Sequence, residues 1–290
     1  MEHYRVPEQA HKYINHELVR RYTELPDFPH FRTRLLYAFL TRQENMPQRY
    51  SELYSLVTSL VQVGLDTHDL VDAAEPGVNQ KLNRPNQLRV LAGDYLSSRF
   101  YQLLAQAGQV EWVKKLSQAI CEVNRLKINF YMMVKHLRLT AEEYLQQLVH
   151  IRSALFLSFT QAMEQSYRKL WPEVLELFTR CELLMEELER TREPARFPQS
   201  WAYWYVLQEG NLEEQRFVRE ADPAHEPHKV NQLIHKYRIV SLLHGMLEKH
   251  LSQLYALISR FESDRLAEEL RKLANALNPL VAKPIALEEI

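Results

Sequence analysis

Glycine is scarce in this chain, which contains only 6 glycines among 290 residues. Sheet proteins need tight turns at short intervals, and such turns favour glycine, so a β fold is disfavoured. Leucine, glutamate, glutamine, arginine and alanine are abundant instead, and 46% of the residues are hydrophobic, which is enough to fill a sizeable core. The composition predicts an all-α protein.

An excess of one charge is also missing. The 36 basic and 37 acidic residues give a formal net charge of -1 and are spread along the chain, so no long-range field is available to hold a nucleic acid. The two cysteines, Cys121 and Cys181, lack the spacing of a zinc or redox site and are too few for a disulfide framework. We expect both thiols to be buried and reduced.

Long apolar runs are absent as well. No window approaches the ~18 uncharged apolar residues of a membrane-spanning helix. Residues 1–22 carry charges and histidines where a signal peptide would have an apolar centre. We expect a cytoplasmic protein whose contact with a membrane is at most peripheral.

Hydrophobic periodicity predicts a series of helices separated by proline-rich breaks. The first predicted helix starts near Pro7 and ends before Pro26, and a buried central helix runs from Tyr50 through Val63. The other predicted helices are Phe31–Leu40, Leu88–Ala107, Val110–Leu137, Thr140–Ser166, Glu173–Arg192, Lys229–Phe261 and Asp264–Leu277. Thr140 and Glu143 have the spacing of a capping box. Pro194 and Pro198 indicate a boundary, with a helical core over residues 1–192 and a C-terminal helical region over 193–290 packed on the same bundle.

An aspartate-rich stretch, Leu65 to Asp72, ends the predicted central helix. It resembles the motif Leu-Leu-His-Asp-Asp-x-x-Asp of the all-helical isoprenyl diphosphate synthases, with His68 at the first Asp, Asp69 at the second and Asp72 at the last. Mg²⁺ prefers oxygen ligands, whereas imidazole is a nitrogen donor suited to zinc or copper, so His68 predicts a weakened magnesium site. Without the rest of the chain, Asp66, Asp69 and Asp72 are more typical of a solvated acidic helix end.

Two further stretches support the resemblance by their order and spacing. Leu91 to Leu96 resembles Leu-x-Gly-Asp-Tyr-Leu of that family, with Tyr95 at the tyrosine position. The resemblance implies that Gly93 allows two helices to approach closely and that Asp94 is a polar support within the bundle. Residues 142–145, Glu-Glu-Tyr-Leu, and residues 154–156, Ala-Leu-Phe, match a second family pattern.

The chain departs from the family where diphosphate would bind. Ile151 and Arg152 stand where the family has Lys-Thr, and cations replace carboxylates in the stretch that would be Glu-Gly-Glu-x-x-Gln, over residues 125–130. The second aspartate-rich motif has no counterpart, and we interpret the glutamates of the later helices as exposed helix charges. They are Glu186, Glu187, Glu189, Glu213 and Glu214.

The pattern is similar to component 1 of the two-component heptaprenyl diphosphate synthases, a non-catalytic subunit. The resemblance implies that a catalytic subunit, component 2, carries the Mg²⁺, that farnesyl diphosphate or the growing prenyl chain binds at a shared site, and that the product serves menaquinone side-chain synthesis. It also implies a heterodimer through residues 88–107 and 110–130. The resemblance also implies that this subunit helps to set the chain length of the product, and Val63 and Gly64 are candidates for the product tunnel.

Phe100, Tyr101 and Leu104 are interface candidates if they form an exposed patch with Leu103, and ordinary core residues otherwise. The aromatic cluster Trp201, Tyr203, Trp204 and Tyr205 fits a membrane anchor, a subunit interface or core. His225 and His228 indicate a surface loop more than a metal site. A zinc site at His68 and Asp72, a residual enzyme using His68, Asp69 and Asp72, and a helical adaptor unrelated to isoprenoids remain alternatives.

Overall fold

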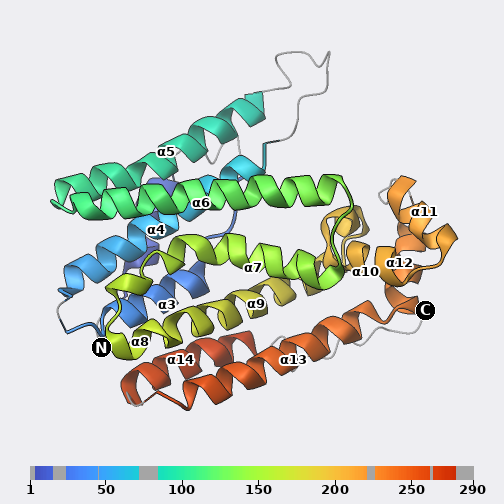
Figure 1. Cartoon of the computed structure of the whole chain (residues 1–290). Helices are drawn as coiled ribbons and strands as arrows, with labels where there is room; N and C mark the ends of the chain where they lie inside the picture. Colours follow the sequence, from blue (N-terminus) through green and yellow to red (C-terminus); the bar gives the residue numbers. More distant parts are fainter. Residues whose placement is uncertain are drawn as a thin grey trace. The chain divides into compact units, whose positions relative to one another are not determined.

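The computed structural model describes residues 4–15, 24–44, 46–71, 84–220, 226–261 and 264–278. Within these ranges the chain forms helices joined by turns and contains no strand, as the composition predicted (Figure 1). The α-helices are α1 (Val6–Ile14), α3 (His30–Leu40), α4 (Gln48–Asp69), α5 (Arg84–Gln106), α6 (Val110–Lys135), α7 (Ala141–Leu157), α8 (Gln165–Arg168), α9 (Leu170–Arg190), α10 (Trp201–Glu209), α11 (Leu212–Glu220), α12 (Pro227–Lys236), α13 (Ile239–Ile258) and α14 (Asp264–Leu277).

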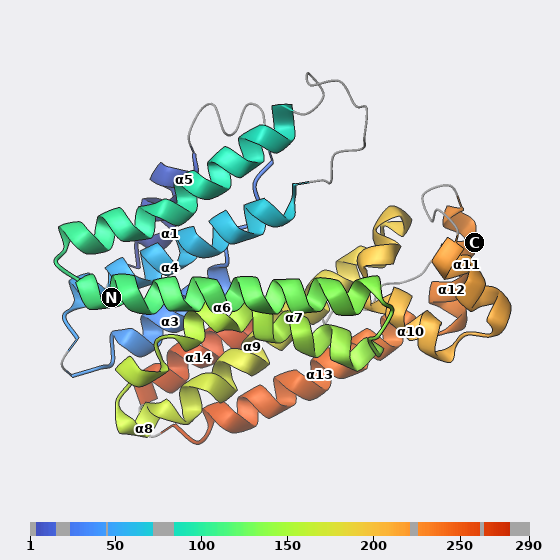
Figure 2. The same cartoon turned by 45° about the horizontal axis from the view of Figure 1, so that its top comes forward.

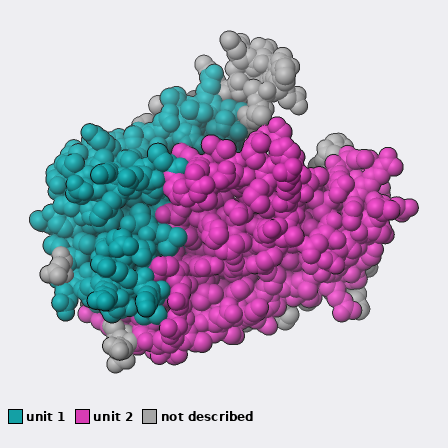
Figure 3. Space-filling view, in the orientation of Figure 1, with its two compact units in different colours: residues 1–121, 155–171 teal, residues 122–154, 172–290 magenta. Residues whose placement is uncertain are grey.

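The chain divides into two compact units, which Figure 3 shows in different colours. Unit 1 comprises residues 1–121 and 155–171, and unit 2 comprises residues 122–154 and 172–290. Helices α6, α7 and α9 therefore contribute residues to both units. The boundary expected between residues 192 and 193 falls inside unit 2, and as a division of domains it stays a prediction.

Unit 1 is organised around α4, which packs against α1, α3 and α5 (Figures 1 and 2). Fourteen of its residues are fully or nearly buried, because apolar and small polar side chains follow one another on all sides of the helix. One face joins a hydrophobic cluster whose buried members are Val6, Ala10, Tyr37, Leu56, Leu60, Val63 and Leu96. Near the start of α4, the ring of Tyr54 meets that of Trp112, which stacks on Phe159 with 4.4 Å between ring centroids.

Unit 2 is built on α13 and α14, which pack side by side. Leu243, Leu247, Leu251 and Leu254 recur at helical spacing along α13, and all are buried. The second helix buries Leu266, Leu270 and Leu277, and its bounds match the expected Asp264–Leu277. The amphipathic pattern of this region was therefore sufficient to predict the helix.

The helix expected over Thr140–Ser166 was too long, because α7 ends at Leu157. Beyond that point the hydroxyls of Ser158 and Thr160 donate to the carbonyls of residues 155 and 157, at 2.6 and 2.7 Å. The amide of Glu164 then donates to the side chain of Gln43, and the Glu164 carboxylate accepts the amide of Glu44 at 2.6 Å. These local and long-range hydrogen bonds replace those that a continued helix would make.

The long helix expected over Lys229–Phe261 was also wrong, because it is broken into α12 and α13. Arg238 separates the two with a φ of 50°, in the left-handed region that helices do not use. The end of α12 is held by Glu214, which accepts from the Tyr237 hydroxyl at 2.7 Å and from Lys236 at 2.6 Å. Hydrogen bonds to α11 therefore fix the position of the break.

Other local predictions are confirmed. The amide of Thr140 donates to Glu143 at 2.8 Å, and the amide of Glu143 donates to the Thr140 hydroxyl at 3.2 Å, as in a capping box. Pro7 lies in the first turn of α1, residues 16–23 of that predicted helix lie outside the described ranges, and residues 24 and 25 are not helical. No helix in the described ranges combines the length and apolarity that crossing a membrane would require.

Candidate functional site

The C-terminal half of α4 and the N-terminal half of α5 form the candidate site, because they carry the aspartate-rich stretch and the Gly-Asp-Tyr landmark. Gly64 brings the two helices together. A Cβ atom at Gly64 would lie 2.8 Å from the amide nitrogen of Ser97 and 2.9 Å from the carbonyl oxygen of Gly93. Both contacts are with backbone, so any side chain at this position would push α5 away.

The expected product-tunnel residues have defined neighbours. Val63 is fully buried in the hydrophobic cluster of unit 1, and Gly64 faces the backbone of α5. Their part in setting product length stays a prediction. The backbone contact also means that Gly64→Phe would separate α4 from α5 whatever the route of the product, so that substitution cannot test a tunnel.

The ring of His68 packs against Gly93. A Cβ atom at Gly93 would lie 2.7 Å from both Cε1 and Nε2 of the His68 ring, so the imidazole occupies the space that a side chain would need. The same Nε2 is 3.3 Å from Oδ1 of Asp94. The histidine that replaces the first motif aspartate therefore binds the Gly-Asp landmark of the neighbouring helix, which confirms that Gly93 permits a close approach.

The strength of this pair is limited by solvent. The side chain of Asp94 is 67% exposed and that of His68 is 32% exposed. Asp94 is thus a surface partner of His68, and the expectation that it supports the interior of a bundle was wrong. A pair at this exposure contributes about 0–1 kcal/mol to stability, so its main effect is to orient the ring.

The remaining motif residues do not complete a magnesium site in the described ranges. Asp66 accepts a hydrogen bond from Gln62 Nε2 at 2.8 Å, Asp69 is exposed at the end of α4, and Asp72 lies outside the described residues. The first motif position offers an imidazole that already contacts a carboxylate, whereas Mg²⁺ needs several oxygen ligands. The described part of the motif therefore does not fit this metal. Across the described residues, no group of three or more His, Cys, Asp or Glu could hold a metal ion.

The α5 residues expected at an interface separate into two classes. Phe100 and Leu104 are buried and Leu103 packs against the hydrophobic cluster, so the four-residue exposed patch is not formed. Tyr101 is 61% exposed and remains available. Tyr95 is half-buried, with the guanidinium of Arg99 4.3 Å from its ring centroid.

In unit 2, Arg152 occupies the position of the family's diphosphate-binding threonine. It forms a two-point ion pair with Glu186, in which one of the two contacts measures 2.7 Å. Its neighbour Ile151, at the position of the lost lysine, is buried. The cation that this stretch retains is therefore already neutralised by a carboxylate.

Glu187 of α9 is buried, so the interpretation of this residue as an exposed helix charge was wrong. Its side chain is 1% exposed, pairs with Arg190 at 2.6 Å and accepts the backbone N–H of Trp201 at 2.7 Å. Burial, partly offset by Arg190, raises the pKa of Glu187. The i, i+3 spacing to Arg190 was visible in the sequence, but the neighbour that buries the pair was not.

The aromatic segment that begins α10 belongs to the core of unit 2. Trp201 and Trp204 are buried, and Trp201 stacks on Tyr205 with 4.8 Å between ring centroids. These indole rings are therefore not free to insert into a bilayer. His228 is exposed in the first turn of α12, whereas His225 lies outside the described residues.

The two cysteines differ. Cys181 is buried as expected, and burial raises the pKa of its thiol to about 12. Cys121 on α6 is exposed, so the expectation that it is buried was wrong. The cause is that residue 121 falls on the solvent side of an amphipathic helix whose buried positions include Leu116 and Val123.

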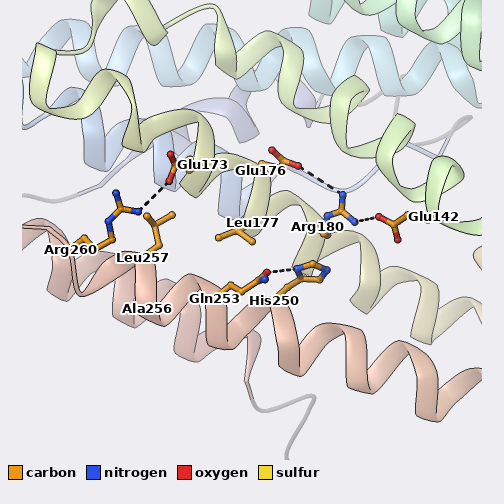
Figure 4. A pocket seen from close by; sticks show the side chains of 10 residues that line it. All are labelled: Glu142, Glu173, Glu176, Leu177, Arg180, His250, Gln253, Ala256, Leu257 and Arg260. Carbon is orange, nitrogen blue, oxygen red and sulfur yellow. Dashed lines mark hydrogen bonds and ion pairs between the residues drawn. The ribbon is translucent and has the colours of Figure 1, made fainter.

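Unit 2 also contains a pocket of about 590 Å³ between α7, α9 and α13 (Figure 4). Its charged side chains pair with one another: Arg180 with Glu142 at 2.7 Å, and Arg260 with Glu173 at 3.6 Å. His250 pairs with Gln253 at 2.9 Å, and burial lowers the pKa of this imidazole. The lining residues are Glu142, Glu173, Glu176, Leu177, Arg180, His250, Gln253, Ala256, Leu257 and Arg260.

Known structures share this fold. A geranylgeranyl pyrophosphate synthase from Lactobacillus brevis superposes with a TM-score of 0.70 at 13% identity over 96% of this chain and 97% of that one. A heptaprenyl diphosphate synthase from Staphylococcus aureus gives a TM-score of 0.68 at 13% identity over 96% of each chain. An octaprenyl pyrophosphate synthase from Helicobacter pylori gives 0.66 at 14% identity over 96% of this chain and 97% of that one. At these identities the likeness shows the fold alone.

Sequence comparison is more specific. Heptaprenyl diphosphate synthase component 1 from Geobacillus stearothermophilus is 36% identical over 72 residues, which are 25% of this chain and 30% of the relative. The match thus spans less than a third of that relative's length. The model of the family described as heptaprenyl diphosphate synthase (HEPPP synthase) subunit 1 matches residues 16–235. The chain therefore belongs to the heptaprenyl diphosphate synthase subunit 1 family.

Proposed function

We propose that this chain is the non-catalytic subunit of a two-chain trans-polyprenyl diphosphate synthase. A second chain would supply the Mg²⁺ and the prenyl-transfer chemistry, and farnesyl diphosphate or the growing prenyl chain would bind at the shared site. By resemblance, the product is a heptaprenyl diphosphate for menaquinone side chains. We place the complex in the cytoplasm, with at most peripheral membrane contact.

The observation that carries this proposal is the contact of His68 with Gly93 and Asp94. Prenyl transfer requires departing diphosphate to be neutralised by metal ions that carboxylates hold. In this chain the first carboxylate is replaced, and its replacement contacts the neighbouring helix. Because the lost metal contacts would each contribute a few kcal/mol, and about 1.4 kcal/mol corresponds to a tenfold rate change, catalysis by this chain alone would fall by orders of magnitude.

A second observation supports the same assignment from unit 2. Arg152 is paired with Glu186, and Ile151 replaces the cationic lysine of the family pattern. A diphosphate at Arg152 would compete with the Glu186 carboxylate, which already forms a two-point ion pair with this guanidinium. The stretch that resembles a diphosphate-binding site therefore lacks an unengaged cation at these two positions.

The partner surface that we propose includes one face of α6. Ile128, Tyr131 and Met132 are large apolar side chains in the part of this helix that belongs to unit 2, and all are exposed. Apolar side chains gathered along a helix face are typical of protein interfaces. Tyr101 of α5 is a further candidate, because its side chain is 61% exposed.

The test is to purify the chain alone, the chain that carries both intact aspartate-rich motifs, and the two together. We expect the mixture to elute as one complex and to convert farnesyl diphosphate and isopentenyl diphosphate to a long-chain product with Mg²⁺. We expect this chain alone to show no turnover. Magnesium-dependent turnover by the isolated chain would instead favour the residual-enzyme alternative.

The adaptor alternative makes a different prediction. A helical adaptor unrelated to isoprenoids would neither bind a synthase chain nor change its products. The family match over residues 16–235 does not favour it. If this chain formed no complex with any chain that carries both intact motifs, the result would favour the adaptor alternative.

A further inference from the structure

Helix α4 has a third face, which neither the hydrophobic cluster nor the contact with α5 explains. Ser51, Ser55, Thr58 and Gln62 follow one another at helical spacing and therefore lie along one side of the helix. Each of them is 0% exposed. Asp66, one turn beyond Gln62, is half-buried, and Asp69 is exposed at the end of the helix. This polar face thus runs from the interior to the surface beside the degenerate motif.

Several polar atoms of this face lack partners. In the described ranges, the hydroxyls of Ser51 and Ser55 and the Oε1 atom of Gln62 form no hydrogen bond, although each is fully buried. Neighbouring hydroxyls show the usual alternative: Thr58 donates to the carbonyl of Tyr54 at 2.7 Å, and Ser59 donates to that of Leu56 at 2.7 Å. The unpaired atoms are therefore not a general property of small polar residues in this helix.

Burying a hydroxyl or amide oxygen without a hydrogen bond is unfavourable, because the group loses its hydration and gains nothing in return. Native proteins satisfy such groups, commonly with ordered water that makes ~3 hydrogen bonds to buried polar atoms. Ser51, Ser55, Thr58 and Gln62 are all uncharged, so the fully buried part of this face carries no charge of its own. Water is the ligand that matches neutral donors and acceptors along one side of a helix.

We propose that the face formed by Ser51, Ser55 and Gln62 is a binding site for ordered water. Asp66, which is half-buried, and Asp69, which is exposed, continue this face to the end of α4. The water site stands on the contacts of α4 alone, whereas its consequence for a prenyl chain rests on the proposed function. A hydrated face is a poor wall for hydrocarbon, because a prenyl chain laid on it would displace the water and leave the hydroxyls unpaired. The growing product is therefore kept off this side of α4.

The test of the water site does not need the catalytic partner. Crystals of the full chain at a resolution that shows ordered water are expected to contain density within hydrogen-bond distance of Ser51 Oγ, Ser55 Oγ and Gln62 Oε1. Ser55→Ala is expected to lose the water at residue 55. Ser59→Ala is the matched control, because the Ser59 hydroxyl is already satisfied within the helix, and it is expected to keep that water.

A dry face in the unmodified chain, or the same water in Ser55→Ala, would overturn the proposal. Soaking the crystals with farnesol as an isoprenoid probe tests the second half: the face is expected to stay hydrated, and isoprenoid density along Ser51 to Gln62 would overturn the exclusion of hydrocarbon. Both experiments use this chain alone. Their failure is therefore distinguishable from a failure to form an active complex, which would count against the proposed function instead.

Discussion

The imidazole of His68 fills the space that a side chain at Gly93 would occupy, since a Cβ atom there would lie 2.7 Å from two ring atoms. The position of the His68 ring therefore requires glycine at residue 93. A histidine can stand at this motif position because α5 offers it a glycine, together with the Asp94 carboxylate as a partner for its Nε2.

Gly93→Ala is expected to destabilise the chain by roughly 1–2 kcal/mol, because the His68 ring must move and give up Asp94. The same substitution in a His68→Ala background should be harmless or slightly stabilising, since the obstructing ring is gone and alanine favours helix. Chemical denaturation of the single and double variants measures the difference. Gly245→Ala is the control: nothing lies within 4 Å of its Cβ position, so it should stabilise α13 by about 0.5–1 kcal/mol.

Gly64→Ala is expected to be more harmful than Gly93→Ala. Its Cβ atom would meet backbone atoms of residues 93 and 97 at 2.9 and 2.8 Å, and backbone cannot rotate away as a ring can. We expect a loss of about 1–3 kcal/mol in the free energy of unfolding. If Gly64→Ala were as stable as the unmodified chain, the close approach of α4 and α5 would be incorrect.

His68→Asp restores the first motif carboxylate but places it beside Asp94. Loss of the imidazole contact and repulsion between two acids are expected to lower stability by roughly 1 kcal/mol. We expect no Mg²⁺-dependent turnover by the isolated variant, because Ile151 and Arg152 still differ from the family's diphosphate-binding residues. Prenyl transfer assayed with farnesyl diphosphate checks this, and measurable activity would show that His68 alone separates this chain from a working enzyme.

Glu187 gives stability a defined pH dependence. Its pKa is raised in the folded chain, so the folded state binds more protons than the unfolded state between the unfolded and folded pKa values. The contribution of this group is therefore complete below the unfolded pKa and is lost as pH rises through the folded pKa, with a slope of at most about 1.4 kcal/mol per pH unit.

Glu187→Gln removes this titration, so its free energy of unfolding should fall less than that of the unmodified chain as pH rises through that window. Denaturation at a series of pH values provides the comparison. Glu189→Gln is the control, since this exposed carboxylate pairs with Arg192 at the surface. Parallel pH profiles for the unmodified chain and Glu187→Gln would contradict the burial of Glu187.

Ile128→Glu tests the proposed partner face of α6. The side chain is 64% exposed, so the substitution should leave the stability of the isolated chain nearly unchanged. Burying the new charge against a partner should raise the Kd of the complex at least tenfold, which corresponds to about 1.4 kcal/mol. Leu212→Glu on α11 changes a side chain that is 84% exposed and is expected to leave Kd unchanged. Equal Kd values for both variants would exclude this part of α6.

Local patterns in the sequence predicted local structure well. The capping box at Thr140, the bounds of α14 and the close approach at Gly93 all depend on residues within one or two helical turns, or on the size of a single residue. The end of α7 and the break at Arg238 were missed, because Gln43 and Glu214, which lie far away in the sequence, hold those turns.

The candidate site was predictable in its location but not in its contacts. Sequence spacing placed His68 at the end of a buried helix, and the structure adds that its ring meets Asp94. The burial of Glu187 was hidden for a similar reason: its partner, the amide of Trp201, follows a proline-rich turn whose path no helical periodicity describes.

The different environments of the two cysteines have a practical consequence. Cys181 is buried, and its thiol stays protonated at neutral pH, so maleimide reagents should react at Cys121 alone. The natural chain thus accepts a single fluorophore without mutagenesis. Because Cys121 lies on α6, emission from that dye would report directly on whether a second polypeptide covers the helix.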